Sequence, residues 1–317
     1  MGGSLAAVHS LVQGAACALH LAGGRHHAGR AAASGFCYVN DVVLSALALR
    51  HAFGRVLVLD VDCHHGDGTE AAFADDDGVV TVSWHRHGPG FYPASGAADS
   101  CSIQNGVINV PYGAGIGDDV FCEVFDAVVS AAWDAYKPAA VLLVAGVDAL
   151  ARDPSRGGNL THLAFKHVTQ RLLRLCAPSG AKEQVQVQQE HSARTESSNL
   201  VHFGSEGRAG HVGTHSMASS ADMGPPTAKA TAADMGPPTA KATAEKPVRA
   251  EASLEPTQEA YSVGNCHQGT APVVPLLILG GGGYAPGPSA VAFSHIVAEA
   301  TGQSLPPRVP EHQFLNL

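Results

Sequence analysis

Three continuous apolar runs constrain this chain more than any other feature of its sequence. They occupy residues 55–61, 139–145 and 273–279, contain almost no polar residues, and are rich in Val, Ile and Leu. Such runs are typical of strands that are buried on both faces of a parallel sheet. Shorter runs at 79–83 and 107–110 indicate two further strands.

Segments with helical character lie between these runs. The predicted helices span residues 4–22, 41–52, 118–136, 162–175 and 288–301. Asn40 is the expected N-cap of the second helix, because its side chain can accept a hydrogen bond from the first helical turn. Strands that alternate with helices form βαβ units, so the sequence predicts an α/β fold with a parallel sheet.

The composition changes abruptly at about residue 178. Residues 178–271 are rich in Gln, Ser, Thr, Ala, Gly, Pro and Glu, and the unit ADMGPPTAKATA occurs twice in tandem across 221–244. Because few large apolar residues offset the chain entropy, we predict a low-complexity, disordered insertion, with a partner-binding loop as the alternative. The core domain is then split into residues 1–177 and 272–317, since a long surface insertion adds little loop-closure entropy.

The overall composition argues against several classes of protein. The formal net charge is −9, whereas a general nucleic-acid binder carries a basic face. The seven cysteines include no CxxC pair, so we expect a reduced, intracellular chain without a disulfide framework. No apolar run is long enough to cross a membrane, and the N-terminus lacks the pattern of a secretory signal.

Carboxylates and a histidine follow two of the predicted strands at the points where these end. Asp62 and His64 come after the strand at 55–61, and Asp148 comes after the strand at 139–145. Ligands bind at the carboxyl ends of parallel strands, and residues two apart on extended chain point to the same side. Two carboxylates and one imidazole leave an open position on Zn²⁺, as catalysis requires. Capping or salt-bridged aspartates are the alternative interpretation.

Two adjacent histidines, His26 and His27, precede the first predicted strand. Asp60 and Asp67 are available to hold one imidazole each. A carboxylate raises the basicity of an imidazole and fixes its tautomer, so this pair predicts a general base and a general acid beside a metal-bound water. Two ordinary histidines in a polar loop are the alternative.

Aromatic residues next to glycines complete the candidate site. Tyr284 follows four consecutive glycines, and its phenol can donate a hydrogen bond to a carbonyl oxygen that becomes an oxyanion. A phosphate-cradling loop is the alternative, although no Lys-Ser/Thr follows the glycines. Phe36 and Tyr92 can form two walls of a narrow slot, or they can be ordinary core residues.

Taken together, these motifs resemble those of the zinc-dependent histone deacetylases. In family order they read GGRHHAGRAAASGFCYVND, VLVLDVDCHHGDG, HRHGPGFYPASG, GVDALARDP and LGGGGY. The phrases SGFCYVND, HHGDG and LGGGGY are most similar to class I enzymes, and PGFYP with LPPRVPEHQF points to the lineage of the eighth, non-complexed member of that class. The resemblance implies the arginase/deacetylase fold, a three-layer αβα sandwich around a parallel sheet, and hydrolysis of the acetyl-lysine amide.

The resemblance also implies a role for each matching residue. The zinc ligands are Asp62, His64 and Asp148. The catalytic residues are His26 with Asp60, His27 with Asp67, and Tyr284 as the oxyanion donor. The residues that line the acyl-lysine slot are Gly24, Phe36, Tyr92 and Gly282. A structural K⁺ is held by the side chains of Asp60 and Ser83 and the carbonyls of Asp62, His64 and Trp84, and a second K⁺ lies near Phe73, Asp76 and Val79.

The chain also departs from the family pattern. The family domain normally begins well ahead of the GG…HH segment, so the resemblance implies an N-terminally truncated domain. Arg25 and Ser155 stand where apolar residues are usual. The expected partners are acetylated histone tails or other acetyl-lysine proteins and corepressors, in the nucleus or the cytoplasm, without direct nucleic-acid or membrane binding. An acetylpolyamine-type amidohydrolase and a non-catalytic binding chain are the alternative functions.

Overall fold

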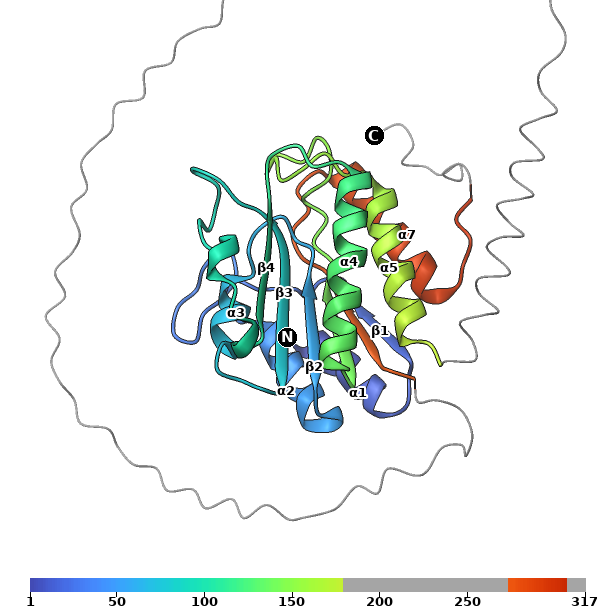
Figure 1. Ribbon diagram of the computed structural model, residues 1–317. Coiled ribbons are helices and arrows are strands. Elements are labelled where there is room, and N and C mark those ends of the chain that lie inside the picture. The colour runs from blue at the N-terminus through green and yellow to red at the C-terminus, as the bar shows by residue number, and fades with distance from the viewer. Residues whose placement is uncertain (179–272, 307–317) are drawn as a thin grey trace, which may run out of the picture. The chain divides into compact units, whose positions relative to one another are not determined.

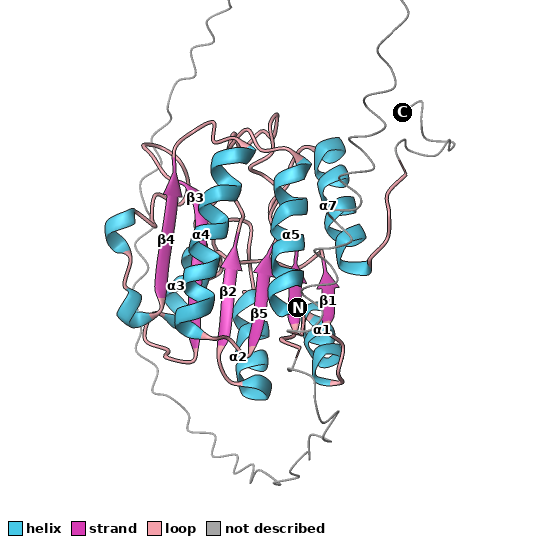
Figure 2. Ribbon diagram, turned by 45° about the vertical axis from the view of Figure 1, so that its right-hand side comes forward, coloured by secondary structure: helices cyan, strands magenta, loops and turns pink. Residues whose placement is uncertain are grey.

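In the part of the chain that the structure describes, six parallel strands form one sheet, and helices cover both of its faces (Figures 1 and 2). The computed structural model describes residues 1–178 and 273–306. The strands are β1 (Cys17–His20), β2 (Val56–Asp60), β3 (Val79–Arg86), β4 (Val107–Tyr112), β5 (Ala140–Val144) and β6 (Leu276–Leu279). Their order across the sheet is β1-β6-β5-β2-β3-β4. The insertion predicted at 178–271 lies almost entirely outside the described residues.

The helices form two layers. On one face lie α1 (Gly2–Val12), α2 (Asp41–Phe53) and α3 (Asp67–Phe73), and on the other lie α4 (Asp118–Tyr136), α5 (His162–Cys176) and α7 (Pro286–Thr301). Two short 3₁₀ helices, η1 (Ala98–Ser100) and η2 (Ile103–Asn105), precede β4. This arrangement confirms the predicted three-layer α/β fold around a parallel sheet.

Alternate residues of the central strands enter two separate apolar cores. In β2, Leu57 and Leu59 pack under α4 and α5, whereas Val56 and Val58 pack under α1 and α2. All five residues of β2 and of β5 are buried. The continuous apolar runs are therefore explained, because a strand that is covered on both faces has no solvent-facing side.

The N-terminal helix is shorter than predicted. Helix α1 ends at Val12, and Cys17–His20 forms the edge strand β1 rather than the end of a helix over 4–22. Gly14 adopts φ = +102°, which reverses the chain and prevents the helix from continuing. Residues 17–20 then pair with β6. The apolar sequence suited either structure, and pairing with a distant strand decided between them.

Other boundaries moved by a few residues. Asn40 caps α2 as predicted, since its side chain accepts a hydrogen bond from the Val43 amide at 3.0 Å. Helix α3 was not predicted; it is only seven residues long. Strand β6 begins at Leu276 rather than at residue 273, directly after Pro275, whose nitrogen cannot donate to a ladder.

The register of the strands places the site. Asp60 of β2 lies beside Val144 of β5, which lies beside Leu279 of β6. Because all strands run in the same direction, the loops that leave these residues begin at the same edge of the sheet. None of the described cysteines forms a disulfide. No helix within the described ranges is both long and apolar enough to span a bilayer.

Candidate metal centre and histidine pair

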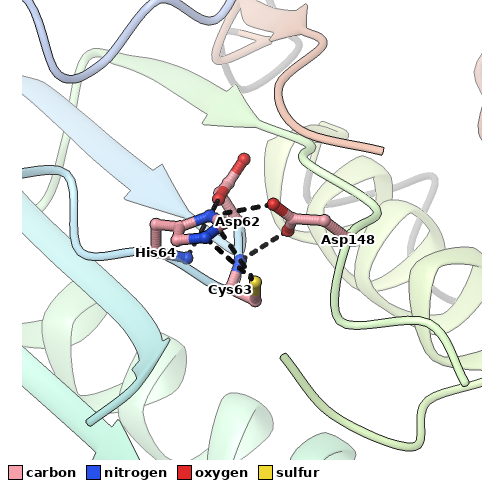
Figure 3. A group of neighbouring side chains, drawn as sticks. All are labelled: Asp62, Cys63, His64 and Asp148. Atoms are coloured by element: carbon pink, nitrogen blue, oxygen red, sulfur yellow. Dashed lines mark hydrogen bonds and ion pairs between the residues drawn. The ribbon is translucent and has the colours of Figure 1, made fainter. Parts of the chain in front are cut away.

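Three of the predicted ligands converge at the carboxyl edge of the sheet (Figure 3). Nδ1 of His64 lies 3.0 Å from Oδ1 of Asp62 and 2.9 Å from Oδ2 of Asp148. Both carboxylates are buried. Potential ligand atoms of these residues and of Cys63 all lie within 4.8 Å of one another. The sequence prediction of a shared site for Asp62, His64 and Asp148 therefore corresponds to a compact cluster in the structure.

Backbone amides hold both carboxylates in place. Oδ1 of Asp62 accepts a hydrogen bond from the amide of His64 at 2.9 Å, and Oδ2 accepts one from the amide of Gly282 at 2.6 Å. Oδ1 of Asp148 accepts a hydrogen bond from the amide of Cys63 at 2.8 Å. The loops after β2, β5 and β6 are thus joined through the carboxylates themselves, which fixes the orientation of the cluster.

The donor set fits a zinc ion. Oδ2 of Asp148 is buried and makes no hydrogen bond. A single imidazole nitrogen carries at most one proton, so Nδ1 of His64 cannot satisfy both carboxylates at once. Burial, together with the charge of Asp62, raises the pKa of Asp148 to about 6. A cation among two carboxylates and one imidazole removes this penalty, and the residue types are those that Zn²⁺ prefers.

Cys63 lies next to the cluster but does not fit as a ligand. Its Sγ is 3.6 Å from Nδ1 of His64 and 3.6 Å from the hydroxyl of Ser155. Burial raises the pKa of the Cys63 thiol far above its ordinary value. Because zinc is bound by thiolate rather than thiol, the three predicted residues remain the candidate ligands.

Each histidine of the adjacent pair contacts its own carboxylate. Nδ1 of His26 lies 2.6 Å from Oδ2 of Asp60, and Nδ1 of His27 lies 2.7 Å from Oδ1 of Asp67. The two imidazole rings are 4.0 Å apart, centroid to centroid. Both histidines are buried. A carboxylate at Nδ1 fixes the proton there and leaves Nε2 of each ring for chemistry.

The two rings differ in their protonation. Burial acts to lower the pKa of His26, but the charges of Asp60 and Asp62 outweigh it and raise the pKa to about 9. Burial lowers the pKa of His27, and the neighbouring His26 lowers it further, against the effect of the hydrogen bond that Nδ1 donates to Asp67. The surrounding carboxylates thus favour the charged form of His26, whereas burial favours the neutral form of His27.

Aromatic side chains surround an open cavity above the cluster. It has a volume of about 400 Å³ and is lined by His27, Gly35, Phe36, His64, Tyr92 and Tyr284. Phe36 is 83% exposed and Tyr92 is 42% exposed, so the alternative of core aromatics is wrong for both. A second cavity of about 320 Å³ adjoins the first, shares His27, Gly35, Phe36 and Tyr284 with it, and is also lined by His26 and Asp62.

Two glycines of the predicted slot stand at close approaches of the backbone. Gly24 adopts φ = +92°, and a Cβ there would lie 2.2 Å from the carbonyl oxygen of Gly280. A Cβ at Gly282 would lie 2.1 Å from Oδ2 of Asp148 and 2.9 Å from Oδ2 of Asp62. Only glycine leaves room for the carboxylates at the second position.

Gly282→Ala is therefore expected to disrupt the cluster. The added methyl group forces Asp148 or the loop to move, which costs about 1–3 kcal/mol of unfolding free energy and displaces a candidate ligand. Denaturant unfolding and zinc retention after dialysis measure the two effects. Gly287→Ala is the matched control, because a Cβ there meets nothing within 4 Å. Equal zinc retention by the two variants would contradict the prediction.

The potassium sites stay predictions. Asp60 and Ser83 line a cavity of about 10 Å³, the size of one water molecule or ion, whereas the Trp84 side chain is buried in the core. At the second position, the carbonyl of Phe73 accepts a hydrogen bond from the amide of Asp76, and the carboxylate of Asp76 pairs with Arg50.

Sequence reasoning missed two residues that support the site. Asp153 is buried, and its Oδ2 accepts hydrogen bonds from the amides of Tyr284 at 2.7 Å and Ala285 at 3.1 Å. The ring of Phe91 stacks on that of His64 at 5.2 Å. Asp153 lies five residues after Asp148 in the same motif, which is a weak signal; nothing in the sequence pointed to Phe91.

A buried histidine next to the site predicts acid sensitivity. His85 accepts a hydrogen bond from Ser83 at Nδ1 and donates one from Nε2 to the carbonyl of Gly96 at 2.7 Å. Burial, with the charge of His65, lowers the pKa of His85 to about 4. Between pH 6.5 and pH 4 the unfolded state binds one more proton at this histidine than the folded state does. The unfolding free energy therefore decreases as the pH is lowered, by about 3 kcal/mol over this range.

Urea unfolding across this pH range measures the effect. His85→Gln, which keeps a donor for Gly96, removes the titration and is expected to flatten the pH dependence. His51→Gln, at an exposed position on α2, is the control and leaves the dependence unchanged. The same slope in the parent and in His85→Gln would show that other groups are responsible.

Comparison with known proteins gives one family. Residues 1–189 match the model of the histone deacetylase domain. The chain is 42% identical over 164 residues to histone deacetylase 8 of Danio rerio, which covers 50% of this chain and 43% of that protein. Histone deacetylase 8 of Xenopus laevis is 42% identical over 164 residues, 50% of each chain. Histone deacetylase 9 of Arabidopsis thaliana is 45% identical over 139 residues, 43% of this chain and 33% of that protein.

The alignments cover only part of each relative's length. The chain spans about half, or less, of the length of these curated proteins. The domain model, however, matches more than half of this chain and includes the histidine pair and all three candidate ligands. By its sequence and by its parallel α/β sheet, the chain belongs to the histone deacetylase family, in the lineage of histone deacetylase 8.

Proposed function

We propose that the chain is a zinc-dependent protein lysine deacetylase that hydrolyses acetyl-lysine to lysine and acetate. One observation carries this proposal: His64 of the metal cluster and His27 of the histidine pair line the same aromatic-walled cavity, and Asp62 and His26 line the cavity that adjoins it. A metal site with an open position and a split pair of imidazoles is the arrangement that amide hydrolysis requires.

Asp62, His64 and Asp148 would hold the zinc ion, which supplies a Lewis acid for the acetyl carbonyl and lowers the pKa of a bound water. His27 is neutral, so its Nε2 can take a proton from the attacking water while Asp67 holds Nδ1. The same imidazole can then pass the proton to the leaving lysine amine. Asp60 contacts Nδ1 of His26 at 2.6 Å, and Nε2 of the same ring lies 3.8 Å from Oδ1 of Asp62, so this imidazole is held beside the candidate metal ligands.

Tyr284 acts as a hydrogen-bond donor in this scheme. Burial and the charges of Asp62 and Asp148 raise the pKa of its phenol far above the ordinary value, so the hydroxyl keeps its proton. It can therefore donate to the oxyanion of the tetrahedral intermediate. Phe36 and Tyr92 line the cavity, where their rings can pack against the methylenes of an acyl-lysine.

The test is the turnover of an acetyl-lysine peptide by the purified, zinc-loaded chain and by Tyr284→Phe. We expect hydrolysis by the parent and a loss of about 10²–10³-fold in kcat for the variant, because one oxyanion donor is removed. Zinc content and far-ultraviolet circular dichroism control for folding. Equal rates for both proteins would remove Tyr284 from the mechanism.

The alternative functions give different results in the same assay. Preferential turnover of a free acetylpolyamine would favour an amidohydrolase of small molecules. Zinc binding by a folded chain without any hydrolysis would favour a binding chain. Potassium binding, corepressor partners and a nuclear or cytoplasmic location stay proposals that rest on the family.

A further inference from the structure

Three arginines line a hollow at the carboxyl edge of the sheet. Arg86 is the last residue of β3, and Arg152 and Arg156 lie in the loop that follows β5. The hollow has a volume of about 590 Å³, and its other lining residues include Pro154 and Asn159. Three positive charges around one hollow are unusual for a chain with a formal net charge of −9.

Within the described ranges, no carboxylate balances these charges. Arg152 and Arg156 are both exposed and make no ion pair. The guanidinium of Arg86 donates to the backbone carbonyl of Arg156 at 2.5 Å and lies 4.5 Å from the centroid of the Phe91 ring. The hollow is therefore lined by one guanidinium group that its neighbours hold in place and by two exposed ones, and none of the three forms an ion pair with a described residue.

Asp153, the acidic residue that lines the hollow, is not the anionic partner of the arginines. Asp153 is 2% exposed, and its carboxylate accepts four hydrogen bonds. Two come from the amide and the hydroxyl of Ser155, and two come from the amides of Tyr284 and Ala285. The hydrogen-bonding capacity of this carboxylate is therefore used by the chain's own donors, and it forms no ion pair with Arg86, Arg152 or Arg156.

The two arginines of the loop after β5 both have a left-handed backbone conformation, which is strained for this residue type. Arg152 adopts φ = +73° and Arg156 adopts φ = +54°. Glycine or asparagine occupies such left-handed positions with less strain than arginine. Sparsely populated backbone conformations concentrate at functional sites, which points to a functional role for these two side chains.

The hollow borders the candidate catalytic site. A single ring, Phe91, separates Arg86 from His64, since it lies under the guanidinium on one side and stacks on the imidazole on the other. Asp153, which lines the hollow, also accepts a hydrogen bond from the backbone amide of Tyr284. A group bound by the arginines would thus sit beside a substrate whose reacting end enters the aromatic-walled cavity.

We propose that this hollow binds an acidic group, a carboxylate or a phosphate, on the acylated protein and so selects acyl-lysines with acidic neighbours. Planar guanidinium groups form paired, charge-assisted hydrogen bonds with both kinds of anion. The proposal rests on the proposed function for its catalytic consequence. Its binding component is independent of turnover.

The experiment measures the binding of fluorescent acetyl-lysine peptides to the zinc-loaded chain by anisotropy, together with kcat and KM. The peptides form two matched pairs near the acetyl-lysine: Glu against Gln, and phosphoserine against serine. We expect the acidic peptide of each pair to bind about tenfold more tightly at low ionic strength, and this preference to shrink with added salt. The effect should appear in KM, with kcat nearly unchanged.

The test variant is Arg152→Asn/Arg156→Asn, because asparagine tolerates left-handed backbone. It should reduce the acidic preference to less than about twofold while turnover of the neutral peptides stays at the parent level. The control is Arg55→Gln/Arg174→Gln, which removes two positive charges from the opposite end of the sheet and should keep the preference. Inorganic phosphate added as a competitor should weaken the binding of the acidic peptides more than the binding of the neutral ones.

Three outcomes would overturn the proposal. They are an equal affinity of the parent for acidic and neutral peptides, a preference that persists in the test variant, and an equal loss in test and control variants. If no peptide is hydrolysed but the acidic peptides bind through Arg152 and Arg156, the deacetylase function fails and the anion site stands. If the neutral peptide is hydrolysed and no acidic preference exists, the anion site fails alone.

Discussion

Asp148→Asn is expected to lower zinc affinity by at least about a hundredfold. The substitution keeps the size of the side chain and its hydrogen bond to the amide of Cys63, but it removes the negative charge that faces Nδ1 of His64. Because Asn is a neutral and weaker donor, one of three candidate ligands is lost. Competition with a chromophoric chelator measures the affinity, and peptide hydrolysis should be lost in parallel.

The same change at an exposed position is the control for this experiment. Asp134→Asn, on the solvent side of α4, removes one negative charge far from the cluster and should leave zinc affinity unchanged. Since burial and Asp62 already disfavour the charged form of Asp148, the apo form of Asp148→Asn is expected to unfold at a denaturant concentration no lower than the parent's. Normal zinc affinity in Asp148→Asn would exclude this residue as a ligand.

His27→Ala is expected to reduce kcat/KM by about 10²–10⁴-fold while zinc is retained. His27 lines the cavity, its Nδ1 contacts Asp67, and burial lowers its pKa, so its Nε2 is the candidate base. The loss should lie mainly in kcat, because the proposed role of this imidazole is proton transfer. Steady-state kinetics with an acetyl-lysine peptide gives the comparison.

His51→Ala controls for the loss of a histidine as such, since His51 is exposed on α2. Partial recovery of His27→Ala by added imidazole would support the proton-transfer role directly. A variant with unchanged kcat, or one in which zinc is lost along with activity, would contradict the assignment of His27 as a base.

The central strands could be predicted because their environment leaves a simple pattern. Strands β2 and β5 are covered by helices on both faces, and their sequences are apolar throughout. Strand β1 could not be predicted in this way. Its four residues are compatible with the helix before them, and only pairing with Leu276–Leu279 makes them a strand.

The candidate site could be predicted where its functional side chains come directly after the end of a strand. Asp62, His64 and Asp148 need only the rule that parallel strands end at one edge, and their side chains meet as that rule predicts. Asp153 and Phe91 needed knowledge of how separate loops fold against each other. The arginine hollow is similar, since its arginines come from the end of β3 and from the loop after β5, at no characteristic spacing.

The position of β6 in the sheet has a consequence for the newly made chain. Among the described strands, β1 pairs only with β6, and β5 has β6 as one of its two neighbours. Until residues 276–279 leave the ribosome, these two strands therefore expose unpaired backbone edges, which favour association between nascent chains. Tyr284 lies four glycines after β6, so the segment that completes these two pairings also carries the phenol. The candidate ligands Asp62, His64 and Asp148 are therefore synthesised well before the strand and the tyrosine that complete the candidate site.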